Sequence, residues 1–183
     1  MLQPNPKQLP RPSAFIGSLK MMESRDDGPA RAGLAALRIG LRSKDGVCLE
    51  AMPHVAPYLG ECENEAKDRW FFAVATLFAL HPQDQPGRES LGGAFAKLRK
   101  ESDSIEKRFQ LLLACDEENL FEQLVQIVSL LKSKNVPLNW FRLLSDLTGD
   151  DWDDPERPIQ LRWARDFYKP AANLTASQAA PSN

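Results

Sequence analysis

Apolar residues recur along this chain at intervals of three and four, and this spacing predicts helices almost throughout. In residues 30–46, for example, Leu34, Leu37 and Leu41 form one apolar stripe of a helix. No segment shows the sustained alternation of apolar and polar residues that is typical of strands. The pattern therefore predicts an all-α protein of about eight or nine helices.

Residues that favour helix ends indicate where several of the predicted helices begin or end. We expect Ser13, Ser90 and either Asp103 or Ser104 to cap helices, and Pro29 to lie in a first turn. The segment 116–135 carries acids in its first turn and lysines in its last, which suits the helix dipole. Asn135 is expected to end that helix in the left-handed conformation.

The most apolar segment is residues 64–80, whose large side chains cover most of the circumference of a helix. A helix of this kind belongs in the middle of a bundle. The following stretch, "HPQDQPG", is rich in Pro and Gly and is the best candidate for a seam between two packed lobes. We therefore predict a disordered segment over 1–12, an N-terminal helical lobe over 13–86, a C-terminal bundle over 87–169 and a disordered tail over 170–183.

The composition is typical of a globular protein, with 183 residues, 43% hydrophobic and 26% charged, and a net charge of −2. Because the net charge is slightly negative, binding of a polyanion would require the positive side chains to be gathered on one surface of the protein. The three cysteines are an odd number, which does not suit a set of paired disulfides. The N-terminus lacks the apolar core of a secretory signal. The longest apolar run, residues 70–80, is too short to cross a bilayer. These features predict a cytoplasmic protein.

The sequence contains little that predicts catalysis. His54 and His81 stand beside prolines, and with Cys48 and Cys62 they match no zinc-binding spacing. The segment "LGGAF" lacks the lysine of a phosphate-binding loop, so its glycines indicate close helix packing. We expect no catalytic residue, no metal and no cofactor.

Two further groups of residues have simple interpretations. The acidic segment of Asp150, Asp151, Asp153, Asp154 and Glu156 lacks the glycine and the final glutamate of a calcium loop, which favours a solvated loop or a contact with a basic partner. Among the tryptophans, Trp140 and Trp163 lie next to Leu and Phe on helical segments and are expected in the core. Trp152 has loop neighbours.

Basic residues are the strongest functional signal. On a helix, Arg31, Arg38 and Arg42 fall within roughly 20° of one meridian. Acidic clusters at 116–122 and 146–156 lie mostly apart from the basic ones, so folding can produce a basic face that suits a phosphate backbone. The candidate nucleic-acid-binding residues are Arg31, Arg38, Arg42, Lys97, Arg99, Lys100, Lys107, Arg108, Lys132 and Lys134.

An ordered series of helix-length blocks resembles the CasB family, the small subunits of the Cascade surveillance complex of type I-E CRISPR systems. The blocks are "LFALHPQ", "SLGGAFAKL", "SIEKRFQLLLACDEENLFEQLVQIV", "SLLKSKNVPLNWFRLLSDL" and "RWARDFY". They place the resemblance over roughly residues 14–168, with Asn135 and Asn139 standing where the family pattern leads us to expect Gly and Asp.

The resemblance implies an all-helical, non-enzymatic subunit that is present as two copies in the RNA-guided complex. It further implies contacts with neighbouring Cascade subunits, CRISPR RNA and target DNA, notably the displaced strand. The resemblance carries no motif that says which arginine touches which strand, so the candidate residues above depend on helical geometry and charge alone.

Two other classes of function remain open at the level of sequence. A helical adaptor would use its arginines and its acidic loop for protein contacts only, and would not bind single-stranded DNA. A thiol- or metal-dependent enzyme would need Cys48, Cys62 or a histidine in a pocket.

Overall fold

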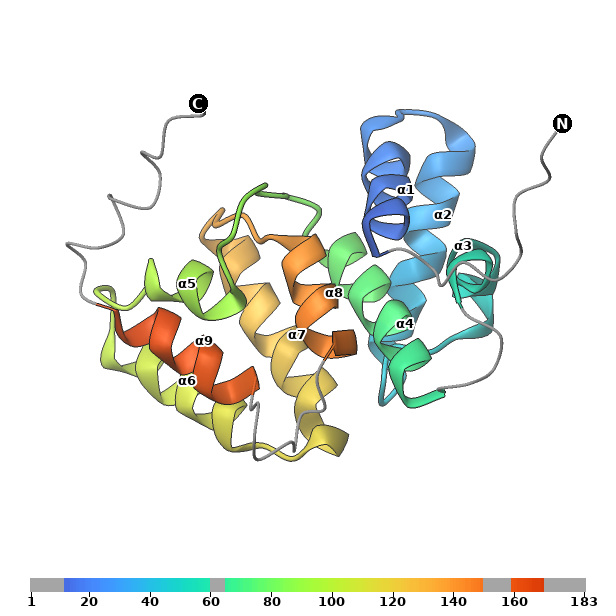
Figure 1. The fold of residues 1–183 in the computed structure, drawn as a ribbon. Coiled ribbons are helices and arrows are strands. Elements are labelled where there is room, and N and C mark those ends of the chain that lie inside the picture. The colour runs from blue at the N-terminus through green and yellow to red at the C-terminus, as the bar shows by residue number, and fades with distance from the viewer. Residues whose placement is uncertain (1–11, 60–64, 150–158, 170–183) are drawn as a thin grey trace, which may run out of the picture.

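The computed structural model describes residues 12–59, 65–149 and 159–169 (Figure 1). Within these ranges the chain forms nine α-helices and three short 3₁₀ turns, and no strand, which confirms the all-α prediction. The helices are α1 (Pro12–Ser24), α2 (Gly28–Ile39), α3 (Met52–Val55), α4 (Glu65–Leu80), α5 (Leu91–Ala96), α6 (Asp103–Ala114), α7 (Glu117–Ser133), α8 (Trp140–Gly149) and α9 (Ile159–Tyr168). The 3₁₀ turns are η1 (Gly40–Arg42), η2 (Leu49–Ala51) and η3 (Ala56–Tyr58).

Helix α4 occupies the middle of the molecule, as its apolar circumference predicts. It lies between α1–α3 on one side and α7–α8 on the other (Figure 1), and it packs on α2, α7 and α8. Every residue from Trp70 to Ala79 is buried, Thr76 included. The hydroxyl of Thr76 donates to the backbone carbonyl oxygens of Leu37 and Gly46, so its polar group is satisfied inside the core.

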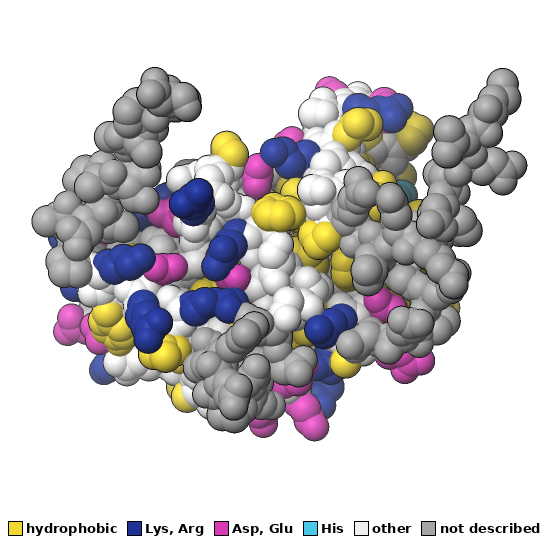
Figure 2. Space-filling model, in the orientation of Figure 1, with side chains coloured by type: hydrophobic (Ala, Val, Ile, Leu, Met, Phe, Trp, Pro, Cys, Tyr) yellow, Lys and Arg dark blue, Asp and Glu magenta, His cyan; other side chains and the backbone are white. Residues whose placement is uncertain are grey.

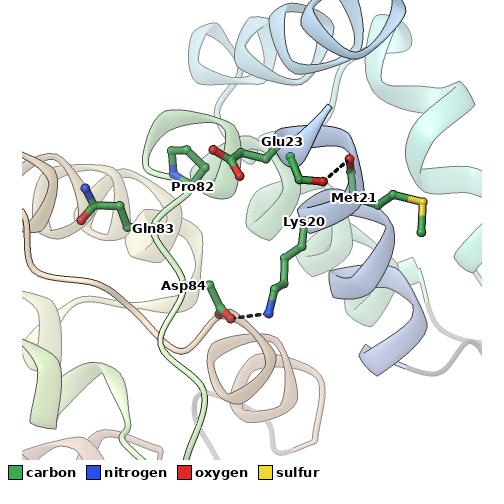
Figure 3. A pocket seen from close by; sticks show the side chains of 7 residues that line it. Lys20, Met21, Glu23, Pro82, Gln83 and Asp84 are labelled. Carbon is green, nitrogen blue, oxygen red and sulfur yellow. Dashed lines mark hydrogen bonds and ion pairs between the residues drawn. The ribbon is translucent and has the colours of Figure 1, made fainter. Parts of the chain in front are cut away.

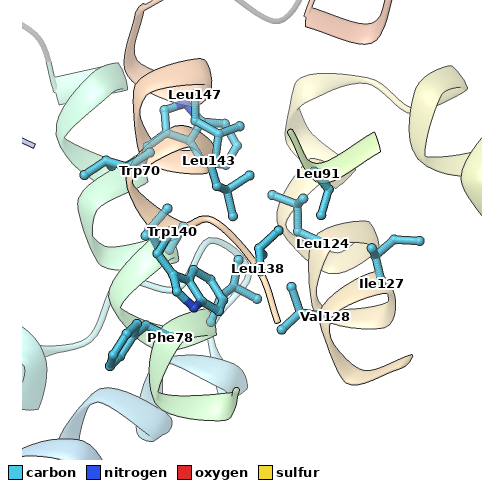
Figure 4. Packing of buried hydrophobic residues seen from close by; sticks show 14 of the residues in the cluster. Trp70, Phe78, Leu91, Leu124, Ile127, Val128, Leu138, Trp140, Leu143 and Leu147 are labelled. Carbon is cyan, nitrogen blue, oxygen red and sulfur yellow. The ribbon is translucent and has the colours of Figure 1, made fainter. Parts of the chain in front are cut away.

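The core between α4, α7 and α8 is built around Trp140 (Figure 4). This side chain is fully buried, and its ring meets the ring of Phe78 edge to face at a centroid distance of 5.6 Å. Trp163 on α9 is also fully buried. Both tryptophans are core residues as predicted, while Trp152 lies outside the described residues.

Helix ends follow the sequence signals in most places. Asp27 caps α2 by accepting a bond from the backbone N–H of Ala30, with Pro29 in the first turn, and Ser90 caps α5. Asn135 has a φ of 52°, so its predicted left-handed conformation is confirmed.

Two predicted caps are wrong by one or two residues. Helix α1 already includes Pro12, which needs no N–H in a first turn, so Ser13 lies inside the helix and not before it. The cap of α6 is Ser102, whose hydroxyl oxygen accepts a bond from the backbone N–H of Ser104.

The helix predicted over residues 30–46 is shorter than expected. The regular α-helix ends at Ile39, and η1 continues to Arg42 as a tighter 3₁₀ turn. The reason is a close approach at Gly40, where an added Cβ would overlap the hydroxyl of Thr76 and the carbonyl oxygen of Gly46. Arg42 therefore does not continue the α-helical meridian of Arg31 and Arg38.

The stretch predicted as a seam runs as an extended connection from α4 to α5, and residues 138–140, at the start of α8 and just before it, hold it in place. Its backbone pairs with Leu138 through bonds at Gln83 and Gln85, and Asn139 donates to the carbonyl oxygen of Gly87. A groove opens here beside α1, where Lys20 and Asp84 form an ion pair at 2.6 Å (Figure 3). The division into lobes at residue 86 stays a prediction, because α4 packs on elements of both sides.

The glycines of "LGGAF" allow α5 and α9 to pack closely, as predicted. A Cβ at Gly92 would overlap the carbonyl oxygen of Trp163 and lie 2.7 Å from its carbonyl carbon. Helix α9 therefore runs directly against the backbone of α5.

The terminal segments and the acidic loop of the predictions fall on residues 1–11, 150–158 and 170–183, outside the described residues. Among the described helices, none is both long and apolar enough to span a bilayer.

Stability is expected to fall in mild acid because His81 is buried without a charge. Its Nε2–H donates to the carbonyl oxygen of Val136 at 2.8 Å, and burial lowers the pKa of His81 below its ordinary value of 6.5. Below about pH 6.5 the unfolded chain binds a proton that the folded chain excludes, so acid favours unfolding by up to about 1.4 kcal/mol per pH unit.

Urea unfolding between pH 7 and pH 5 measures this dependence. The His81→Gln variant can donate to Val136 through its side-chain amide but does not titrate, so its profile should be flatter than that of the wild type. Parallel profiles for the two proteins would contradict the assignment.

Candidate nucleic-acid interface

Lys and Arg side chains gather over the face formed by α5 and α9 (Figure 2). Three aromatic rings from α5, α6 and α9 support this face from within, namely Phe95, Phe109 and Phe167. The rings of Phe109 and Phe167 stack at a centroid distance of 4.2 Å. The packing of these rings, together with the close contact at Gly92, holds the basic residues that follow α5 beside those of α9.

Three of the predicted residues in this part of the chain have partners. Lys97 contacts Glu89 at 2.8 Å and Gln85 at 3.0 Å, and Lys134 forms an ion pair with Glu101. Arg99 donates to the carbonyl oxygen of Phe167 at 3.2 Å, near the C-terminus of α9. These cations help to hold elements together, although each remains exposed at the surface.

Four other predicted residues are exposed and form no ion pair within the described ranges. They are Lys100, which precedes α6, Lys107 and Arg108 on α6, and Lys132 near the end of α7. Because none of the described carboxylates forms an ion pair with them, their charges remain available to an anionic partner.

The three arginines of the N-terminal part differ from one another. Arg31 lies 3.7 Å from the carboxylate of Asp26, with both side chains well exposed, which is a weak contact. Arg38 donates through Nε to the carbonyl oxygen of Ala79 at 2.8 Å and so ties α2 to the end of α4. Arg42 is exposed and forms no ion pair with a described residue. Folding thus places three candidates with α2 and η1 and the other seven with α5–α7.

The last helical segment contributes basic residues that the sequence prediction did not include: Arg162 and Arg165 lie on α9, and Lys169 directly follows it. Their spacing of three and four was a usable signal, because it puts all three within roughly 60° on a helix. Arg165 is exposed, and Lys169 forms an ion pair with Asp166.

A buried carboxylate, Asp146 on α8, links α8 to α9. One of its oxygens, Oδ2, accepts a hydrogen bond from the indole N–H of Trp163 at 2.9 Å. The other, Oδ1, lies 3.0 Å from Arg142 Nε and 3.1 Å from Arg162 Nη2. Burial raises the pKa of Asp146, while the bond from Trp163 and the two guanidinium charges act in the opposite direction.

The structure describes three of the residues considered for metal or thiol chemistry, namely Cys48, His54 and His81. Cys48 is half-buried beside the carbonyl oxygen of Ala36, and His81 is committed to Val136. No group of three or more potential metal ligands occurs in the part of the chain that the structure describes. Cys62 lies outside that part.

The fold and this face define a class: an all-helical protein that presents clustered positive charge on one surface. Residues 33–168 match the family model of the CRISPR-associated protein Cse2. The chain is 35% identical over 161 residues to a CRISPR-associated protein Cse2 of Thermus thermophilus, covering 87% of this chain and 90% of the relative. This chain therefore belongs to the Cse2 family, which confirms the resemblance found in the sequence.

Solved structures agree with this assignment. The crystal structure of CasB from Thermus thermophilus superposes with a TM-score of 0.72 at 34% identity, covering 86% of this chain and 97% of that one. A chain from a structure of a CRISPR RNA-guided surveillance complex superposes with a TM-score of 0.72 at 28% identity, covering 94% and 99%.

Proposed function

We propose that this chain is a non-catalytic small subunit of a CRISPR RNA-guided surveillance complex in antiviral defence. In that complex it contacts the sugar–phosphate backbone of target DNA, notably the displaced strand, and bridges neighbouring subunits. The observation that carries the proposal is the basic face over α5 and α9 in a member of the Cse2 family. The proposal places the protein in the cytoplasm with a second copy of itself, other Cascade subunits and CRISPR RNA as partners.

The basic face over α5 and α9 has the properties that such a subunit needs. When the guide pairs with its target, one duplex is exchanged for another of similar stability. Protein contacts with the strand backbones can therefore decide whether the guide–target duplex is favoured. Those contacts must not depend on sequence, since the guide already reads the bases. Exposed cations that form no ion pair with a described carboxylate, such as Lys107 and Arg108, meet this requirement.

Removing the free cations of the C-terminal part is expected to weaken target binding and to reduce its salt dependence. The variant replaces Lys100, Lys107, Arg108 and Arg165 with alanine in the assembled complex. Each lost contact with a single-strand phosphate lowers the slope of log K against log salt by about 0.7, so loss of all four lowers it by about 3. Affinity is measured by titrating labelled target DNA over a salt series, with an expected loss of tenfold or more.

A matched control replaces Arg25 and Lys44, which are exposed but already lie beside Asp27 and Glu118. This control should keep wild-type affinity and slope. A third variant with alanine at Arg31 and Arg42 tests the N-terminal candidates separately. If the four-residue variant keeps both affinity and slope, the backbone-contact proposal is wrong and the protein-only adaptor takes its place.

A further inference from the structure

Helix α9 exposes a stripe in which apolar and basic side chains alternate. Leu161, Arg165 and Tyr168 are spaced by four and three residues, so they fall within roughly 60° of one line along the helix. Leu161 is 46% exposed, Tyr168 is 43% exposed, and Arg165 is also exposed. Because the buried Trp163 and Phe167 lie on the opposite side of α9, the stripe faces away from the core.

Contacts with neighbouring residues fix the aromatic side chain of this stripe. The hydroxyl of Tyr168 donates to Glu106 Oε1 at 3.0 Å and accepts a bond from Gln110 Nε2 at 3.3 Å. Its ring meets the ring of Phe167 edge to face at a centroid distance of 4.9 Å. The polar end of Tyr168 is therefore satisfied by α6, and a ring held in this way loses little freedom when a ligand binds it.

Positive side chains flank Tyr168. Arg165 lies one turn before it on α9, and Lys107 follows Glu106 on α6; both are exposed and form no ion pair with a described residue. The guanidinium carbon of Arg99 is 5.9 Å from the centroid of the Tyr168 ring, which is too far for stacking contact but within the range of a cation–π attraction. Hydrophobic side chains accordingly lie next to Lys and Arg over α6 and α9 (Figure 2).

We propose that Tyr168 is a stacking site for an unpaired base of single-stranded nucleic acid, with Arg165 and Lys107 on the adjoining phosphates. The inference rests on the proposed function and adds a contact with bases to the backbone contacts proposed there. Every base has a face that stacks on an aromatic ring, so the contact suits a subunit that does not read sequence.

The charges around Tyr168 favour a single strand over the other partners that an apolar stripe could bind. In a duplex the bases are already stacked on one another, whereas an unpaired base can turn towards a protein ring. Arg165 and Lys107 supply the positive charge that follows a strand backbone. The nearby carboxylate of Glu106 is engaged by the hydroxyl of Tyr168 and by Gln110.

The test compares two target DNAs that differ only in the displaced strand, which carries its bases in one and is abasic at the same positions in the other. Tyr168→Leu keeps an apolar side chain but removes the ring. It is expected to weaken binding of the assembled complex to the natural target fivefold or more, the lower end of what stacking on an aromatic side chain contributes. On the abasic target the variant should bind within about twofold of the wild type, and the salt slope should not change because no charge is removed.

Three further variants keep the test decisive. Tyr168→Trp provides a larger ring and should bind the natural target as tightly as the wild type or more tightly. Phe141→Leu is the matched control, because Phe141 is an aromatic residue of similar exposure, 46%, on α8; it should bind both targets as the wild type does. Thermal unfolding verifies each fold, and Tyr168→Gln, with the same expected loss, replaces Tyr168→Leu if that variant does not fold.

Two results would overturn the stacking site. One is equal affinity of the wild type and the variant without the ring for the natural target. The other is an equal loss on both targets, which would indicate that Tyr168 contacts another subunit. In either case the four-residue variant described above would still weaken binding and lower the salt slope, which separates this proposal from the proposed function.

Discussion

Replacing Gly92 with alanine is expected to lower the free energy of unfolding by about 3 kcal/mol or more. The added Cβ would overlap the carbonyl oxygen of Trp163 and lie 2.7 Å and 2.9 Å from the carbonyl carbon and Cα of the same residue. All three are backbone atoms, so a change of side-chain rotamer cannot relieve the overlap. Helix α9 must move away from α5, and the contacts of Trp163 and Phe167 are weakened with it.

Urea or thermal unfolding measures the loss, which corresponds to a fall in melting temperature of roughly 6–12 °C for a chain of this length. Gly17→Ala is the matched control, because Gly17 lies within α1 and a Cβ there meets nothing within 4 Å. That variant should be as stable as the wild type or up to about 1 kcal/mol more stable. Equal stability of the Gly92 variant and the wild type would contradict the close packing of α5 and α9.

Loss of the Trp140 side chain is expected to cost about 3–5 kcal/mol of unfolding free energy. The residue is fully buried, its ring packs on Phe78 of α4, and its indole N–H donates to the carbonyl oxygen of Gln83 at 3.2 Å. Alanine at this position leaves a cavity between α4 and α8 and removes one of the bonds that fix the connection between α4 and α5.

Two further variants separate these contributions. Trp140→Phe keeps most of the packing but removes the donor, and it should cost only about 1 kcal/mol because Gln83 still accepts a bond from the backbone N–H of Leu138. Phe141→Ala is the positional control, since Phe141 is the next residue and is 46% exposed. A small loss for Trp140→Ala, similar to that of Phe141→Ala, would contradict the central role of Trp140.

These predictions also concern function, because the basic face depends on the same packing. Helix α9 carries Arg162 and Arg165 and is followed directly by Lys169, and Gly92 determines how closely that helix approaches α5. A displacement of α9 would move Arg165 and Tyr168 relative to Lys107, which lies on α6. We therefore expect the Gly92 variant, at a temperature where it is folded, to bind target DNA less tightly than the wild type.

The sequence by itself determined the helical class, the central place of α4 and the close packing at "LGGAF". Each of these depends on residues near one another in the chain: the spacing of apolar side chains, a continuous apolar surface from Trp70 to Ala79, and two adjacent glycines. Local signals also located most helix ends, with errors at Pro12 and Ser102 where more than one residue suits a first turn. The family resemblance depended on the order of such blocks and was confirmed.

Tertiary structure alone decided which positive charges are free and which are engaged. Arg38 meets Ala79 across 41 residues and Arg99 meets Phe167 across 68, and neither partner can be chosen from helical spacing. The end of α2 at Ile39 likewise depends on the approach of Gly40 to Thr76, and the link between α8 and α9 depends on Asp146, Arg142 and Arg162 meeting across two helices. Periodicity reports which face of a helix is polar, whereas the partner of a polar side chain depends on the path of the whole chain.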